Sequence, residues 1–401
     1  MDQGKITGRD IIVFGLQPWD IPIGSNCKNI AEVFARHNRV LYVNRPLDRM
    51  SALRSKKDIQ TRNRLHSIRK GENILSEIKE NLWVFNPGRV LESINFLPPG
   101  WLYNYLNKRN NRMLASEIKV ACHSLHFKDP ILFIDNDFFN GLYLKELLSP
   151  SVFIYYIRDY LRSQHYFQKH GSQSEPLIIK MADGVAANSG YLAQYALQYN
   201  KHSHDVGQGC EVDDFVKVPE SLPADLRTIP HPIIGYCGSI TSTRLNVSLL
   251  EEIARQQPQW SIVLVGPADD VFTASALSGM VNVHFLGSKK PAELPAYVHG
   301  FDVCINPQLL NQMTIGNYPR KVDEYLAAGK PVVATQTETM KIFGNNVYLC
   351  NNTTEYIDAI NRALSNKDIE TERCARQMMG MSHTWEASVN KIYSLIKAVE
   401  K

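Results

Sequence analysis

The sequence of 401 residues has no apolar run that approaches the ~20 residues required by a membrane-spanning helix. Its first residues lack the apolar core of a signal peptide and run quickly into an apparent strand at residues 11–14. The seven cysteines are scattered, odd in number and without paired spacing, which argues against a disulfide framework and against a zinc site. We therefore expect reduced thiols and a cytoplasmic location.

What the sequence does contain is two successive alternations of short β-rich runs with longer helical patterns. Each alternation is typical of a parallel sheet covered by helices, and 401 residues exceed what one hydrophobic core usually supports. Between them, residues 219–232 hold four prolines and little periodicity, which is typical of an interdomain linker. We therefore expect an α/β fold with two tandem Rossmann-like, doubly wound domains facing a cleft, over residues 1–218 and 233–380. An amphipathic helix within residues 381–401 could pack back on the first domain.

The stretch over residues 317–334 carries the most informative pattern. Pro319 suits the first turn of a helix and Gly329 suits the left-handed position after its end, so a helix is expected between them. Lys321 and Glu324 are three residues apart and share one face of that helix. A helix N-terminus suits a phosphate, Lys321 adds positive charge, and Glu324 could accept hydrogen bonds from a ribose diol. An ordinary amphipathic helix with a solvated lysine and glutamate fits the pattern equally well.

The same stretch resembles the donor-site signature of GT-B glycosyltransferases similar to family 4, especially those that build bacterial surface polysaccharides. The resemblance continues upstream as strand and glycine-turn runs in the same order, at residues 235–240, 262–267, 281–287, 294–297 and 302–307. It implies that the first domain binds the acceptor and the second binds a nucleotide sugar.

The resemblance assigns Lys321 to the diphosphate and Glu324 to the ribose. The other residues that it places around the donor are Gly238, Ser239, Arg244, Gly266, Leu286, Gly287, Asn317, Tyr318 and Pro319. Two departures stand out: Gly316 replaces the first member of an acidic pair, and Tyr318 replaces the asparagine that usually precedes the proline. Both leave the sugar and the stereochemical outcome open.

Polar and small residues follow the expected strands of the first domain. Asp20, Gly24 and Ser25 come after the first strand, where they suit an acceptor sugar or a donor phosphate, or form a plain loop. Arg158 and Asp159 end a later strand, and Asp159 could act as the general base for the acceptor hydroxyl, with Arg158 binding the acceptor. A structural ion pair between loops is the alternative, although similar enzymes carry an aspartate at this strand end.

The run Asp135-Asn136-Asp137 superficially matches the metal-binding Asp-x-Asp of the GT-A glycosyltransferase fold. Since GT-A enzymes lack tandem domains, we interpret the run as a cap or a cleft-lining group. We therefore predict no essential metal and no cofactor besides the nucleotide sugar, which is a co-substrate.

The sequence thus predicts a metal-independent, hexosyltransferase-type glycosyltransferase. It would move a sugar from UDP, or from GDP, to a carbohydrate or lipid-linked glycan, without a nucleic-acid partner. The stretch from Arg45 to Lys70 holds nine basic and two acidic residues, which form a solvated face or dock on the anionic inner face of a membrane. One competing hypothesis is a two-domain ligand-binding protein without chemistry. The other is a dinucleotide oxidoreductase, although no Gly-x-Gly-x-x-Gly opens either half.

Overall fold

The structure is a computed structural model, and it describes residues 4–20, 24–54, 59–71, 74–366 and 370–400. The chain divides into two compact units: unit 1 comprises Met1–Gly207 with Trp385–Lys401, and unit 2 comprises Gln208–Thr384. The boundary therefore lies before the expected residue 218. Residues 219–232 are not a separate linker but part of unit 2, because they form a helical turn, α9 (Ala224–Arg227), whose Leu226 is buried in the core of that unit.

Within the described residues, unit 1 contains an eight-stranded sheet in which neighbouring strands pair in parallel, except for the antiparallel pair β3–β4. Successive side chains along these strands point to opposite faces of the sheet, and apolar residues are buried on both faces, as expected for a sheet covered on two sides. In spatial order the strands are β3 (Leu75–Lys79), β4 (Leu82–Phe85), β2 (Arg39–Val43), β1 (Asp10–Gly15), β5 (Ile131–Asp135), β6 (Val152–Ile157), β7 (Gly184–Ala187) and β8 (Ser203–Asp205).

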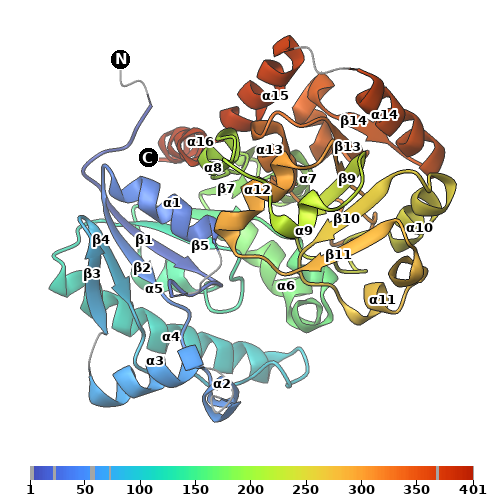
Figure 1. The fold of residues 1–401 in the computed structure, drawn as a ribbon. Coiled ribbons are helices and arrows are strands. Elements are labelled where there is room, and N and C mark those ends of the chain that lie inside the picture. Colours follow the sequence, from blue (N-terminus) through green and yellow to red (C-terminus); the bar gives the residue numbers. More distant parts are fainter. Residues whose placement is uncertain (1–3, 21–23, 55–58, 72–73, 367–369, 401) are drawn as a thin grey trace. The chain divides into compact units, whose positions relative to one another are not determined.

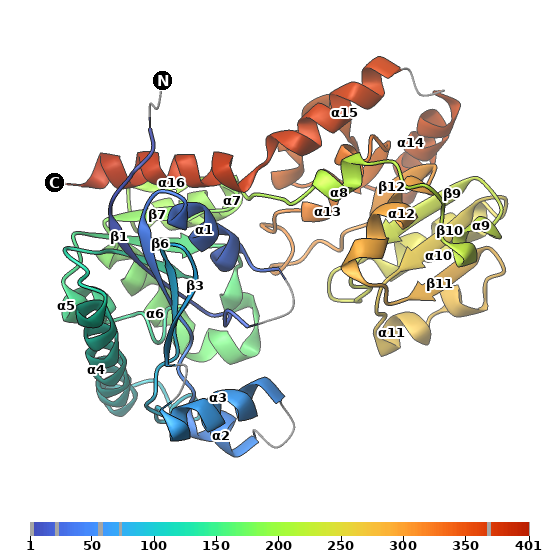
Figure 2. The ribbon, with the colours of Figure 1, turned by 60° about the vertical axis from the view of Figure 1, so that its left-hand side comes forward.

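Helices cover both faces of this sheet (Figures 1 and 2). One face packs against α1 (Asn26–Ala35) and the C-terminal helix α16 (Trp385–Val399), where the rings of Phe34 and Tyr393 lie 5.5 Å apart. The other face packs against α4 (Trp101–Ser124), α6 (His165–Met181) and α7 (Gly190–Leu197). The remaining helical segments of unit 1 are α2 (Arg49–Arg54), α3 (Ile59–Lys70), α5 (Leu144–Leu148) and the 3₁₀ turn η2 (Leu161–Ser163).

Unit 2 contains a six-stranded parallel sheet within the described residues. In spatial order its strands are β11 (Val283–Gly287), β10 (Ser261–Val265), β9 (Ile233–Cys237), β12 (Val303–Asn306), β13 (Val332–Thr335) and β14 (Tyr348–Cys350). The strand order reverses direction beside β9, which is the switch point at which doubly wound sheets bind ligands. The two doubly wound folds that the sequence predicts are confirmed.

Helices also cover both faces of the second sheet (Figure 1). The face built by α10 (Val247–Gln256), α11 (Asp270–Thr273) and α14 (Thr353–Ser365) forms one core, and that built by α8 (Asp213–Val216), α9, α12 (Leu294–His299) and α13 (Arg320–Ala327) forms the other. The remaining segments are α15 (Glu370–Ser382) and the 3₁₀ turns η3 (Ala276–Gly279), η4 (Pro291–Glu293) and η5 (Thr339–Asn346).

Candidate functional site

Helix α13 starts where the sequence pattern predicts, and its N-terminal half carries the candidate donor residues Lys321 and Glu324. Pro319 occupies the N-cap position and Gly329 adopts a positive φ of 76° just beyond the helix end. The ammonium of Lys321 lies 3.1 Å from the carboxylate of Glu324, and Arg320 lies 3.8 Å from the other carboxylate oxygen. Only 8% of the Glu324 side chain is exposed, so the helix does not match the alternative of a solvated lysine–glutamate face.

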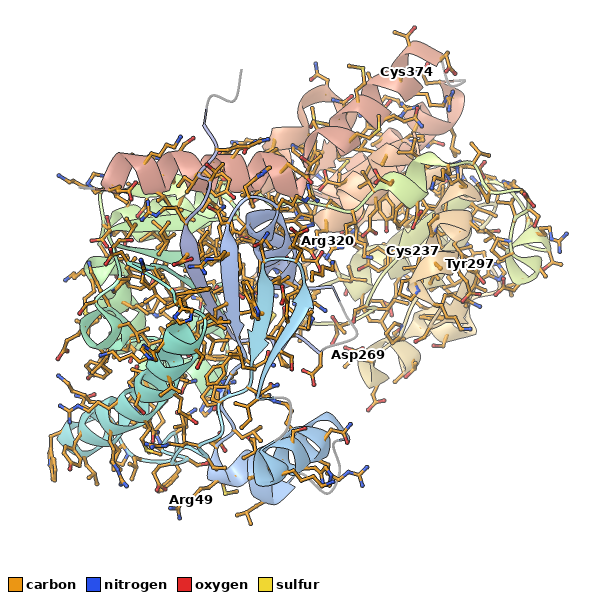
Figure 3. All side chains as sticks on the ribbon, turned by 90° about the vertical axis from the view of Figure 1, so that its left-hand side faces the viewer. Arg49, Cys237, Asp269, Tyr297, Arg320 and Cys374 are labelled. Atoms are coloured by element: carbon orange, nitrogen blue, oxygen red, sulfur yellow. The ribbon has the colours of Figure 1, made fainter. Side chains whose placement is uncertain are left out.

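The buried side of α13 anchors this turn to the end of β9. The hydroxyl of Tyr325 accepts a hydrogen bond from the Cys237 amide at 2.8 Å and donates one to the Cys237 carbonyl at 3.2 Å. Figure 3 labels Arg320 at the start of the helix and Cys237 at the strand end. The helix is therefore fixed against the carboxyl edge of the sheet, where parallel α/β folds bind ligands.

Two glycine turns meet beside Lys321. A Cβ atom on Gly238 would lie 3.1 Å from Cε of Lys321, so the missing side chain leaves space for the lysine stem. A Cβ atom on Gly266 would lie only 1.8 Å from the carbonyl oxygen of Gly238, and both glycines have positive φ. Glycine is therefore required at both positions, because the backbones approach closely and adopt angles that L side chains avoid.

The loops that follow these glycines are held together by backbone and side-chain hydrogen bonds. Asp269 accepts hydrogen bonds from the amide and hydroxyl of Ser242 at 2.7 and 2.8 Å. The carbonyl of Ser239 accepts a bond from the Tyr236 hydroxyl at 3.3 Å, and the exposed Arg244 lies in the same loop. Burial raises the pKa of Tyr236, while the charge of Arg244 acts in the opposite direction.

The neighbouring predicted donor residues have structural partners. The Gly266 amide donates to the carbonyl of Gly287 at 2.9 Å, where the φ of Gly287 is 70°, and Leu286 packs against the core. The amide of Asn317 donates to the carbonyl of Thr314 at 3.0 Å. These contacts position the ends of β10 and β11 and the approach to α13.

A contact between a carboxyl and an imidazole ring, beside α13, was not expected from the sequence. Asp323 is fully buried, and one of its oxygens lies 2.7 Å from Nδ1 of His383. Burial raises the pKa of Asp323, whereas hydrogen bonds from His383 and Tyr318 act in the opposite direction. The Tyr318 ring also packs edge-on against His383. Tyr318 therefore supports the first turn of α13, a role that its position before Pro319 does not reveal.

The carboxyl edge of the first sheet holds a buried acid–base pair. Asp135 is fully buried at the end of β5, 3.1 Å from Nε of Arg158, and Arg158 also donates to the Gln17 side chain at 2.9 Å. Burial raises the pKa of Asp135 to about 6, although the charge of Arg158 lowers it. Arg158, predicted to bind the acceptor, thus forms its closer ion pair with Asp135 and a longer one, of 3.8 Å, with Asp159.

Asp159 itself is presented by a capping interaction. The side-chain oxygen of Asn136 accepts hydrogen bonds from the amides of Arg158 and Asp159 at 2.7 and 3.1 Å. The Asp159 carboxylate is 41% exposed, which leaves it accessible to a ligand. Asp137 accepts hydrogen bonds from the amides of Phe139 and Asn140, so it caps the following turn, as the sequence predicts for this run.

The three other predicted acceptor residues differ in their surroundings. Asp20 and Gly24 are exposed, whereas Ser25 is buried at the N-cap position of α1. Its hydroxyl has no hydrogen-bond partner among the residues that the structure describes. Part of this loop, residues 21–23, lies outside the described residues.

The described part of the chain contains no cluster of three or more histidine, cysteine, aspartate or glutamate side chains that could hold a metal ion. Among the described helices, none combines the length and the apolar character needed to cross a bilayer.

Comparison with known proteins gives three kinds of similarity. Residues 231–366 match the family model described as glycosyl transferases group 1. TuaH of Bacillus subtilis (strain 168), named for a teichuronic acid biosynthesis glycosyltransferase, is 26% identical over 230 residues, which cover 55% of this chain and 58% of TuaH. The chain therefore matches less than two thirds of the length of this relative.

Solved structures resemble almost the whole chain. Alr3699/HepE of Anabaena, in complex with UDP, has a TM-score of 0.65 at 15% identity and covers 96% of this chain and 98% of its own. Sucrose-phosphate synthase of Thermosynechococcus elongatus has a TM-score of 0.62 at 16% identity, with 97% and 98% covered. At these identities the similarity shows the fold.

Proposed function

Because residues 231–366 form a glycosyl transferases group 1 domain in a chain with the GT-B fold, we propose that this protein transfers a sugar from a nucleoside diphosphate to a glycan acceptor. The resemblance drawn from the sequence is confirmed at the level of domain family and fold. UDP is the proposed nucleotide, and the HepE structure in complex with UDP supports that choice. The name of TuaH, which refers to teichuronic acid biosynthesis, supports a role in polysaccharide synthesis. We propose that the acceptor is a surface glycan, either free or lipid-linked.

One observation carries the proposal: Lys321, in the first turn of α13, forms a partly buried pair with Glu324, one turn further along the helix, and lies against the side-chain-free Gly238. A diphosphate at this turn would receive the positive charge of Lys321 and the positive end of the helix dipole. These groups would stabilise the charge that develops on the leaving diphosphate without a metal ion. Glu324 would accept hydrogen bonds from the ribose.

Asp159 is the proposed general base for an inverting transfer. Its carboxylate is accessible, and its backbone is held by Asn136 at the carboxyl edge of the sheet. A general base must be accessible to the hydroxyl whose proton it abstracts, and the exposed carboxylate of Asp159 is accessible. If the enzyme retains the anomeric configuration, no side-chain base is needed.

The experiment is a screen of UDP- and GDP-sugars by thermal shift, followed by measurement of nucleotide release. A ligand that binds the native state raises its stability by RT ln(1 + [L]/Kd), so the donor should give the largest shift. Slow release of UDP without an acceptor is expected from the enzyme and not from a ligand-binding protein. If no nucleotide sugar shifts the melting temperature, the proposed function is wrong.

We also propose a peripheral contact between the stretch from Arg45 to Lys70 and an anionic membrane surface. Within the described part of this stretch, Leu53 is 73% exposed and Met50 is 44% exposed on α2. Arg49 is exposed on the same helix (Figure 3). Residues 55–58 of the stretch lie outside the described residues. Binding to anionic vesicles should exceed binding to neutral vesicles at low salt and weaken as salt is added; equally poor capture by both would contradict this contact.

A further inference from the structure

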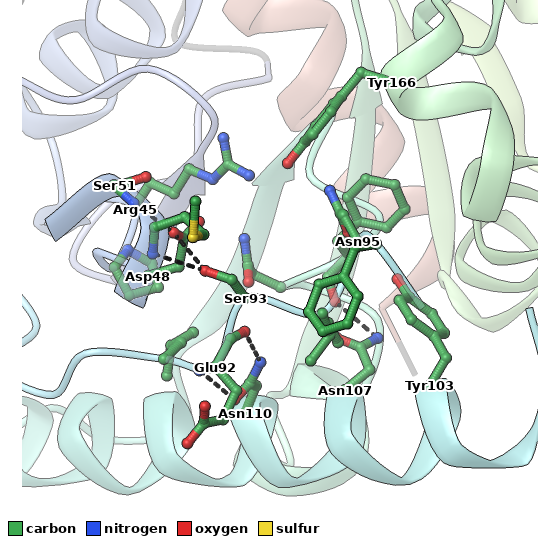
Figure 4. A pocket seen from close by; sticks show the side chains of 17 residues that line it. Arg45, Asp48, Ser51, Glu92, Ser93, Asn95, Tyr103, Asn107, Asn110 and Tyr166 are labelled. Carbon is green, nitrogen blue, oxygen red and sulfur yellow. Dashed lines mark hydrogen bonds between the residues drawn. The ribbon is translucent and has the colours of Figure 1, made fainter. Parts of the chain in front are cut away.

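Unit 1 contains a cavity of about 530 Å³ that the sequence did not indicate (Figure 4). Its walls come from the loop after β2 with α2, residues 91–96, one face of α4, the loop after β5, and Tyr166 at the start of α6. The volume lies within the range of small-molecule sites, about 300–1,000 Å³. Two of these loops leave the carboxyl ends of their strands, as does the loop that carries Asp159.

The cavity is lined by neutral hydrogen-bonding groups and aromatic faces. The hydroxyl oxygen of Tyr103 is buried, and among the described residues it has no hydrogen-bond partner. The side-chain amide of Asn95 makes no hydrogen bond within the described part of the chain either. In Figure 4 Tyr103, Asn95 and Tyr166 lie on one side of the cavity and Arg45 on the other. A buried hydroxyl without a hydrogen-bond partner destabilises the native state, which indicates a polar partner outside the chain.

The charged side chains of the lining already have partners. The carboxylate of Asp48 accepts hydrogen bonds from the Ser51 amide and the Ser93 hydroxyl, both at 2.8 Å. Burial alone would raise the pKa of Asp48, but these bonds hold it below its ordinary value. Glu92 pairs with Arg49 at 2.8 Å, and Nε of Arg45 lies 3.7 Å from the Asp137 carboxylate. The cavity therefore suits an uncharged, hydroxyl-rich ligand better than an ion.

Apolar and aromatic side chains surround the mouth. Phe96 is 74% exposed and Tyr166 is 52% exposed, and both line the cavity together with the exposed Met50. Leu53 follows Met50 by one turn of α2 and is also exposed. Exposed apolar groups beside a polar cavity indicate a ligand with both characters.

We propose that this cavity binds the acceptor as a glycoside, with a pyranose ring inside and an apolar aglycone against Met50, Leu53 and Phe96. The inference rests on the proposed function, because it names the acceptor class of that transferase. Aromatic faces such as that of Tyr166 pack against the apolar face of a sugar ring, while amide and hydroxyl groups bond its hydroxyls. The aglycone would account for the exposed apolar mouth.

The test is calorimetric titration of the full chain with octyl β-glucoside below its micelle concentration, methyl β-glucoside and octyl sulfate. Octyl β-glucoside should bind about tenfold or more tightly than methyl β-glucoside, the gain expected from burying about two methylene groups. It should also bind more tightly than octyl sulfate, which lacks the ring. Tyr166→Ala and Phe96→Ala should each weaken it on the order of three- to tenfold. Tyr105→Ala is the matched control, because Tyr105 is exposed on α4 two residues from Tyr103 and does not line the cavity.

Several outcomes would overturn the inference. The first is that octyl β-glucoside does not bind. The second is that methyl β-glucoside or octyl sulfate binds with the same affinity as octyl β-glucoside. The third is that Tyr105→Ala weakens the binding of octyl β-glucoside as much as Tyr166→Ala does. Titration of the same samples with UDP and with GDP separates this failure from failure of the proposed function. If either nucleotide binds while the glycosides do not, only the acceptor cavity is wrong; if neither nucleotide binds, the transferase proposal itself fails.

Discussion

Lys321 in the first turn of α13 and Glu324 one turn further form an ion pair of 3.1 Å. Because the two side chains already contact each other, a nucleotide that binds Lys321 and Glu324 must alter their ion pair. The two side chains therefore do not contribute to binding independently. Lys321→Ala should weaken UDP binding by about 1.5–3 kcal/mol, or on the order of tenfold to a hundredfold, since a charged hydrogen-bond partner of the diphosphate is lost. Calorimetric titration with free UDP measures this loss.

Glu324→Ala should have a different effect. Removing the carboxylate releases Lys321 for phosphate but removes the proposed ribose contact. The ratio of the affinity for UDP to the affinity for 2′-deoxy-UDP should therefore fall towards one. The affinity for inorganic diphosphate should be unchanged or higher. Glu338 and Lys341 offer a matched control, because they form an exposed pair with the same three-residue spacing at 2.6 Å. If alanine at Lys341 or Glu338 changes nucleotide binding as much, the donor-site assignment is wrong.

The contact between Gly238 and Gly266 makes a separate prediction. Gly266→Ala would place a methyl group 1.8 Å from the Gly238 carbonyl, at a residue whose φ is 144°. The turn must shift, so we expect a loss of stability of roughly 1–3 kcal/mol and weaker UDP binding. Gly279→Ala should change neither quantity, because nothing lies within 4 Å of its added Cβ. Urea unfolding and UDP titration of both variants measure the free energy of unfolding and the UDP affinity. A Gly266→Ala protein with wild-type values of both would contradict the close packing.

How much the sequence could predict depended on the range of the interactions. Pro319 and Gly329 delimit α13 through local backbone preferences, so the helix was predicted nearly to the residue. Helix α6 was not predicted, because Gly171 and Pro176 interrupt a pattern that tertiary packing stabilises nevertheless. Arg320 lies four residues before Glu324, a spacing that could have identified it as a second cation for that carboxylate.

Other features of the sites arise only when distant segments meet. Gly15 packs closely against both Cys27 and Asp135, since a Cβ on Gly15 would lie 2.8 Å from the Cys27 sulfur and 3.1 Å from Asp135. The cavity beside Tyr103 combines five separate segments of unit 1. Contacts between such distant segments cannot be predicted from the period of a helix or the spacing of a motif.

For Asp159, the prediction separates catalysis from binding. Asp159→Asn should reduce sugar transfer by at least about a hundredfold, because general-base catalysis typically contributes that much, and should leave UDP affinity unchanged. The control is Asp129→Asn, which alters an exposed carboxylate just before the amino end of β5, opposite the edge that carries Asp159. Initial rates with the donor identified by thermal shift provide the measurement. Turnover near the wild-type rate in Asp159→Asn would exclude the role of base.

The last prediction concerns Glu175, a buried carboxylate on α6. Its Oε2 accepts a hydrogen bond from the Tyr195 hydroxyl at 3.0 Å, and Arg162 donates to that hydroxyl at 2.7 Å. Burial raises the pKa of Glu175 from 4.5 to about 7, although the Tyr195 bond and the Arg162 charge act in the opposite direction. Between these two pH values the native state keeps a proton that the unfolded state releases. The contribution of Glu175 to the free energy of unfolding therefore falls as pH rises through this window.

Glu175→Gln imitates the protonated carboxyl and removes this pH dependence. We expect the variant to match the wild type near pH 5 and to be more stable near pH 8, on the order of 1–3 kcal/mol, because the native wild type must then bury a charge or hold a proton. Urea unfolding followed by circular dichroism at the two pH values gives the difference. Glu80→Gln, at an exposed position, should show no such change with pH. An equal stability difference between Glu175→Gln and wild type at pH 5 and pH 8 would show that Glu175 titrates normally, and that water reaches its carboxylate in solution.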